Sequence, residues 1–179
     1  MNNVEIIIEN VHRKDLDEIV FKHLHIDKQK MISSHFYDKV NKRDIDFNML
    51  STLEDIFSVP GTGNIYMNEV VLGYCIHDVM VVISFDEDLG DIVINFKESE
   101  LLRSSDNDYM LFFNKLQLII TQYDIDAIVI GYEPASDIDM QLIALTKQSI
   151  NIYTLNFPLT LNDYKKNLYT LFTYKGYSL

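Results

Sequence analysis

Acidic side chains form the most distinctive cluster of chemically active residues in this sequence. Four of the six residues from Asp86 to Asp91 are carboxylates, although carboxylates repel one another and a turn does not require them. Two interpretations remain open: a solvated face that keeps the protein soluble, or a docking surface for a basic partner. In the second interpretation the partner-binding residues are Asp86, Glu87, Asp88, Asp91, Glu98, Glu100, Asp106 and Asp108, with Lys97 and Arg103 as the interspersed bases.

The net charge of the chain is concentrated in its middle part. The formal net charge is −12, and residues 61–146 alone carry 15 acids against three bases. Residues 1–60 carry 11 acids and eight bases, whereas residues 147–179 carry one acid and four bases. Such a field repels phosphate backbones and anionic lipids and attracts basic surfaces. We therefore expect neither nucleic acid nor membrane as a partner.

Other residues of catalytic or metal-binding type have simpler explanations. The tripeptide Asp-Ile-Asp occurs at 44–46, 124–126 and 137–139. Helix capping explains Asp137 and Asp139 better than metal binding does, and Asp124 and Asp126 flank the start of a predicted strand. The five histidines have no metal-ligand spacing with Cys75, and His35 is expected in the core or at its boundary. Cys75, the only cysteine, is expected to be buried in a strand. We predict no catalytic residue, no metal and no cofactor.

The acidic turn lies between two predicted strands. Residues 79–85 are apolar at six of seven positions, which predicts a central strand covered on both faces. Residues 92–97 alternate apolar and polar side chains, which predicts a strand with one face nearer water. Gly90 is expected to close this hairpin with a positive φ. Residues 65–76 form the preceding strand, and the turn before the central strand is expected at His77 and Asp78.

The rest of the chain reads as helices and further strands. Helical spacing predicts helices over 15–25, 28–40 and 47–57, with Ser51 at the start of the third and Pro60 at its end. Residues 4–9 are expected to form an edge strand or a tethered terminus. The patterns further predict helices over 105–123, 137–147 and 160–176 and strands over 127–131 and 150–155, with a final strand at 169–174 as the alternative to the last helix.

This order predicts one α/β domain over residues 1–179 with a mixed sheet. Residues 1–60 are expected to be mainly helical and packed on the sheet of residues 61–179, where a three-strand antiparallel meander precedes α-β-α-β-α crossovers. The element order is similar to a ribonuclease H-like fold, which implies a metal-dependent nuclease with Glu69, Glu133 and Asp137 as candidate ligands. Its start also resembles endonuclease-like cores, but Asn95 replaces the carboxylate of their Glu-x-Lys motif.

Small size, no apolar run long enough to span a membrane, no catalytic motif and a concentrated acidic face resemble the immunity proteins of bacterial contact-dependent inhibition and other polymorphic toxin systems. This resemblance implies a cytoplasmic, non-enzymatic protein that binds a cognate toxin domain. It further implies a basic ribonuclease or deoxyribonuclease, whose active-site cleft would be covered by residues 86–91 and 98–108. A metal-dependent nuclease and an adaptor protein with an exposed strand edge, at 4–9 or 169–177, remain the alternatives.

Overall fold

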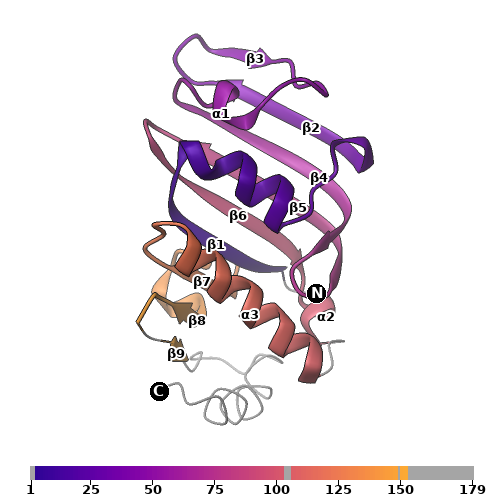
Figure 1. Ribbon diagram of the computed structural model, residues 1–179, viewed down its shortest axis with the longest axis vertical. Coiled ribbons are helices and arrows are strands. Elements are labelled where there is room, and N and C mark those ends of the chain that lie inside the picture. Colours follow the sequence, from indigo (N-terminus) through magenta and orange to yellow (C-terminus); the bar gives the residue numbers. More distant parts are fainter. Residues whose placement is uncertain (1–2, 103–105, 149, 153–179) are drawn as a thin grey trace.

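One antiparallel sheet runs through the chain (Figure 1). The computed structural model describes residues 3–102, 106–148 and 150–152. Nine strands lie in the order β3-β2-β4-β5-β6-β1-β7-β8-β9, and all neighbouring pairs are antiparallel. Their bounds are Asn3–His12 for β1, Met31–Asp38 for β2, Arg43–Ile45 for β3, Gly61–Val71 for β4, Cys75–Phe85 for β5, Leu89–Lys97 for β6, Ile128–Tyr132 for β7, Gln141–Leu145 for β8 and Ile150–Ile152 for β9.

The core lies between this sheet and helices on one of its faces. Figure 1 shows α3 (Asp106–Gln122) and the N-terminal helical segment, which includes the π-helix η2 (Glu18–His23), crossing the same face. The helices meet where Nε2 of His23 and the hydroxyl of Tyr123 lie 2.9 Å apart. The side chains that α3 buries completely are Phe112, Leu116, Ile119 and Ile120. None of the helices in the described part of the chain is long and apolar enough to cross a membrane.

The predicted meander is confirmed as β4, β5 and β6. Strand β5 is the fourth of the nine strands, so the prediction of a central strand is also confirmed. Its inward side chains, among them Val79, Val81 and Ile83, are fully buried. Met80 and Val82 on the opposite face are only half-buried, so this face is less completely covered than the sequence predicted. The alternation follows from the period of two in a strand.

The prediction of an edge strand or a tethered terminus at residues 4–9 was wrong. Strand β1 lies inside the sheet between β6 and β7, where Ile6 pairs with both Ile94 and Ile130. Because β1 is antiparallel to both neighbours, β6 and β7 run in the same direction, as the α3 crossover predicted. The two strands that this crossover joins are not adjacent, however, because β1 fills the space between them.

The predicted mainly helical character of residues 1–60 was also wrong. The first predicted helix is present as short helical turns, η1 (Arg13–Asp15) and η2, but residues 31–38 form β2 instead of a second helix. In β2 only Phe36 and Asp38 are buried, so the apolar spacing that resembled a helix belongs to a strand near the edge of the sheet with few inward side chains. The third helix shrinks to α1 (Leu53–Ile56), which is capped by Thr52 and not by Ser51.

The two turns of the meander differ from the prediction in detail. The β4–β5 turn lies at Gly73, whose φ of 83° favours glycine. His77 and Asp78, predicted as this turn, lie within β5. Gly90 lies in β6, where it pairs with Phe85, and it does not have the positive φ that the sequence predicted. A glycine is needed there for space, because an added Cβ would lie 2.3 Å from the Ser84 carbonyl oxygen and from a ring carbon of Phe85.

The last part of the chain that the structure describes forms a strand where a helix was predicted. After Asp137 there is only a 3₁₀ turn, η4 (Ile138–Met140), and the chain continues as β8. Strand β8 buries four consecutive residues, 142–145, a continuous apolar run that fits either a buried strand or a helix. The predicted strand at 150–155 is confirmed over β9, whereas the predicted elements after residue 152 lie outside the described residues. The ribonuclease H-like order of the mixed sheet is not confirmed.

Candidate functional site

The acidic turn closes the β5–β6 hairpin at one end of the sheet. The Asp86 N–H donates to the Leu89 carbonyl oxygen at 3.4 Å, and residues 86–89 are exposed. Two of its carboxylates are paired with bases of the chain: Asp88 with Arg13 at 2.6 Å and Asp86 with Lys39 at 3.3 Å. Glu87 makes neither a hydrogen bond nor an ion pair within the described part of the chain. The turn therefore presents a surplus of negative charge to solvent.

Glu9 on β1 and Asp126, which precedes β7, add two further carboxylates to the same end of the sheet. Glu9 lies near Asp91 and Asp126, and burial, with these two negative charges, raises the pKa of its carboxyl group. Asn10 holds the two aspartates in place: its N–H donates to Asp91 Oδ1 at 3.0 Å and its side-chain amide to Asp126 Oδ2 at 2.7 Å. We define the acidic end of the sheet as Glu9, Asp86, Glu87, Asp88, Asp91 and Asp126.

The sequence did not reveal Glu9 and Asp126 as members of this group. Glu9 lies 77 positions before Asp86 in the sequence, and Asp126 lies 35 positions after Asp91. Only the insertion of β1 between β6 and β7 brings them together. The one signal that pointed in this direction was the acidic surplus of residues 61–146 as a whole.

The second half of the predicted partner-binding set lies elsewhere. Strand β6 has nine residues, so at about 3.3 Å per residue the turn before it and α2 (Glu98–Leu102) after it lie roughly 30 Å apart. Figure 1 shows α2 at the opposite end of the sheet from this turn. The eight predicted residues therefore do not form one continuous face.

Glu98 and Glu100 are also not surface residues. Each is 7% exposed. The Tyr132 hydroxyl donates to Glu98, and Glu100 accepts from the backbone N–H of His77 at 3.0 Å. Asp108 is half-buried on α3, and Asp106 begins that helix. Both glutamates serve the interior, so we do not retain them as partner contacts.

A small hollow adjoins the acidic end. Its volume is about 230 Å³, and it is lined by His12, Arg13, Lys14, Glu54 and Asp88. Basic side chains therefore stand directly beside the acidic turn. An incoming surface meets both signs of charge here, which favours a defined orientation over a general attraction.

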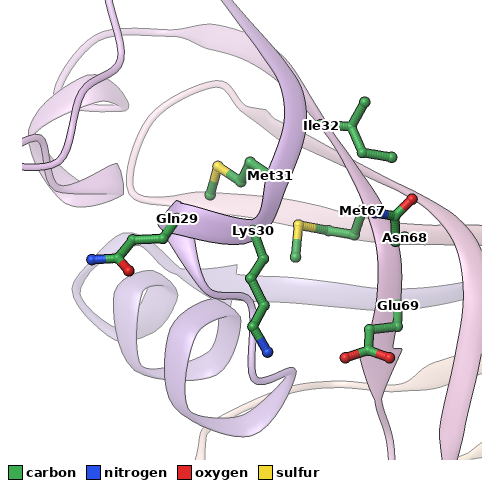
Figure 2. A pocket seen from close by; sticks show the side chains of 7 residues that line it. All are labelled: Gln29, Lys30, Met31, Ile32, Met67, Asn68 and Glu69. Atoms are coloured by element: carbon green, nitrogen blue, oxygen red, sulfur yellow. The ribbon is translucent and has the colours of Figure 1, made fainter.

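A larger hollow lies at the other end of the sheet, between the start of β2 and the end of β4. It has a volume of about 500 Å³ and is lined by Gln29, Lys30, Met31, Ile32, Met67, Asn68 and Glu69. Figure 2 shows the side chains of Lys30, which directly precedes β2, and of Glu69 on β4 extending in the same direction. Met31 and Met67 are register partners across the strand pair. The lining thus combines two flexible thioethers with one cation and one anion.

The residues proposed for a nuclease site are not brought together. Glu69 is near the end of β4, and Glu133 follows β7. These strands are four positions apart in the sheet, which at about 4.8 Å per strand is roughly 19 Å. Two-metal sites need ligands around ions only about 4 Å apart. Glu133 instead accepts a hydrogen bond from Asn3, and Asp137 caps η4.

Two other predictions about single residues were wrong. Cys75 is exposed at the start of β5 and not buried. His35 lies on strand β2 and not in a helix, and its Nε2 is 3.0 Å from Asp44 Oδ1. The error for Cys75 was the register of the β4–β5 hairpin, whereas the error for His35 was the prediction of a helix where the chain forms a strand. Each Asp-Ile-Asp tripeptide has an aspartate that contacts other groups of the chain. Asp44 contacts His35, Asp137 caps η4, and Asp124 pairs with Lys147.

Comparison with known proteins gives two findings. A family model described as PABL017 Cdi1I immunity protein matches residues 2–148. A chain of the crystal structure of the toxic C-terminal tip of CdiA from Pseudomonas aeruginosa in complex with immune protein has a similar fold. Its TM-score is 0.60 at 16% sequence identity, over 80% of this chain and 94% of that chain. The comparison with curated proteins gives no match.

Proposed function

The chain belongs to the PABL017 Cdi1I immunity protein family, and on this premise we propose that it neutralises a cognate CdiA-type toxin domain by binding it. Its role is that of an immunity protein and not of an enzyme. The family match over residues 2–148 is the observation that carries this conclusion. The similar fold comes from a complex of a CdiA toxic tip with an immune protein, which supports a toxin of the same kind as the partner.

We further propose that the toxin presents a basic surface to the acidic end of the sheet. The exposed ion pairs of Asp86 and Asp88 are worth little, about 0 to 1 kcal/mol each, so cationic groups of a partner can replace Lys39 and Arg13. Glu87 is available without any exchange. Positive charge placed here also relieves the repulsion that Glu9 experiences from Asp91 and Asp126.

A basic contact surface is what a nuclease uses to hold a phosphate backbone. An immunity protein that covers such a surface with carboxylates excludes the nucleic acid and needs no chemistry of its own. We therefore propose a ribonuclease or deoxyribonuclease as the toxin class. Association is expected to be fast and to slow with added salt, because exposed charges steer the encounter.

Growth protection tests both levels of this proposal. The product of the gene adjacent to this one, as the candidate toxin, is produced in cells together with one of three forms: the wild type, Asp86→Lys/Glu87→Lys, or Asp46→Lys/Asp139→Lys. The last double variant is the matched control, because it also replaces two exposed aspartate or glutamate side chains by lysine but does so away from the acidic end. Both variants therefore change the net charge equally.

We expect the wild type and the control variant to restore growth and the Asp86→Lys/Glu87→Lys variant to fail. Loss of growth with the wild type would contradict neutralisation itself. Equal protection by all three forms would leave neutralisation in place and refute the acidic end as the contact surface. Failure of both variants would assign the effect to net charge and would also refute a localised surface.

A further inference from the structure

A cluster of metal-ligating side chains lies at the β4–β5 hairpin, outside the acidic end. Glu69, Cys75 and His77 each place one ligand atom within 4.8 Å of the others, and among the described residues this is the one group of three or more such side chains. Cys75 Sγ is 3.4 Å from Glu69 Oε2 and 3.7 Å from His77 Nε2. We propose that this cluster binds one Zn²⁺ ion.

The strand register accounts for the convergence of the three side chains. Glu69 on β4 is paired directly with His77 on β5, and Val71 is paired with Cys75. Cross-strand partners have Cβ atoms about 4.5–5.5 Å apart, and residues two apart in a strand share a face. The backbone of the hairpin therefore sets the three side chains next to one another before any ion is bound.

The distances fit tetrahedral coordination. Zinc binds thiolate at about 2.3 Å and nitrogen or oxygen at about 2.0–2.2 Å. At tetrahedral angles these bond lengths place sulfur roughly 3.6 Å from the other two ligand atoms. The 3.4 and 3.7 Å separations around Cys75 Sγ are close to this value. The third pair of ligand atoms, on Glu69 and His77, lies within 4.8 Å, and tetrahedral coordination requires roughly 3.4 Å for this pair.

His77 is oriented as metal-binding histidines usually are. Its Nδ1 lies 2.9 Å from Oε2 of the buried Glu100, and the same oxygen accepts from the His77 backbone N–H. A carboxylate on one ring nitrogen fixes the ring and directs the other nitrogen to the metal. Here that other nitrogen is Nε2, the atom that faces Cys75. Glu100, predicted as a partner contact, thus acts as a positioning residue.

The ligand set identifies the class of ion. Thiolate and imidazole select zinc over magnesium and calcium, which prefer oxygen ligands. Three protein ligands leave a fourth position open, and the site is at the surface. Zinc binding would displace the thiol proton of Cys75, because the thiolate is the form of cysteine that coordinates a metal.

Zn²⁺ titration of the full chain in competition with a chromophoric chelator tests the site. We expect one equivalent to bind. Glu100→Gln should weaken affinity by about 10- to 100-fold, as outer-sphere substitutions do, and Cys75→Ser should weaken it further. His35→Gln is the matched control, since His35 is also an exposed histidine on a carboxylate, and it should leave the affinity unchanged.

Co²⁺ provides a second measurement that does not depend on affinity, because a cobalt–thiolate bond absorbs in the near ultraviolet. We expect this band in the wild type and its loss in Cys75→Ser. No stoichiometric binding, no thiolate band, or an affinity that Cys75→Ser leaves unchanged would each overturn the proposal. Growth protection by Cys75→Ser should persist, because β5 separates this hairpin from the acidic turn by roughly 33 Å.

Discussion

Replacing Phe112 by alanine tests how α3 holds the sheet together. Phe112 is completely buried, and its ring centroid lies 5.9 Å from that of Tyr74 and 5.2 Å from that of Phe113 in edge-to-face contacts. Buried Phe→Ala changes cost about 3–5 kcal/mol because they remove apolar surface and leave a cavity. We expect a loss of about 4 kcal/mol in the free energy of unfolding, a large part of the 5–15 kcal/mol typical of a domain.

The neighbouring residue provides the control for this substitution. Leu111 is 43% exposed on the outer side of the same helix, so Leu111→Ala should change stability by no more than about 0.5 kcal/mol. Urea unfolding followed by far-ultraviolet circular dichroism measures both, since the chain has no tryptophan to report by fluorescence. Equal losses for the two variants would refute the packing of α3 described above.

Three further substitutions probe other parts of the structure. Gly90→Ala should cost about 1–3 kcal/mol in thermal or urea unfolding, because its Cβ would collide with the Ser84 carbonyl oxygen; an unchanged stability would show that the hairpin is looser than described. Hydrogen bonds from Asn41 and Val40 hold the pKa of Asp38 below its usual value. The stabilisation that Asp38 contributes is therefore complete above the usual carboxyl pKa and is lost as the pH falls through the lower pKa of the folded state. Asp38→Asn should flatten the acid side of a plot of the free energy of unfolding against pH, and a curve parallel to that of the wild type would contradict this. Burial raises the pKa of Tyr123 to about 12, so spectrophotometric titration of Tyr123→Phe should show one late-ionising tyrosine fewer than titration of the wild type. The same substitution should lower the free energy of unfolding by about 1–3 kcal/mol, because it removes the hydrogen-bond partner of His23.

Local patterns in the sequence were sufficient for the meander and its acidic turn. Residues 79–85 and 92–97 have the apolar run and the alternation that strands require, and only a few residues separate them. Both strands and their antiparallel pairing follow from that short-range information. The same holds for α3, whose apolar residues surround most of the helix.

Long-range pairing was not accessible in the same way. Nothing in residues 4–9 specifies that they insert between β6 and β7, more than 80 positions away. Any apolar strand of suitable length satisfies the local pattern, and the choice is made by the packing of the whole sheet. The membership of Glu9 and Asp126 in the acidic end was therefore invisible, as was the distance that separates it from α2.

The zinc site was missed for a different reason. Placing the β4–β5 turn at His77 rather than at Gly73 changed the register of the hairpin, so that Cys75 appeared to lie inside a buried strand. A shift of register moves side chains to the other face of a sheet. With the turn at Gly73, the alternation places Cys75 and His77 on the same outer face of the sheet. Glu69, the register partner of His77, lies on that face as well.

The most direct test of the account is a titration of the purified toxin domain with this protein, in which toxin activity is recorded at each molar ratio. Neutralisation by binding predicts that activity falls in proportion to the added protein and is abolished near one equivalent, with both chains chemically unchanged. Toxin activity that persists at a large excess would contradict the immunity function. Complete inactivation by a small fraction of an equivalent would instead reveal an enzyme.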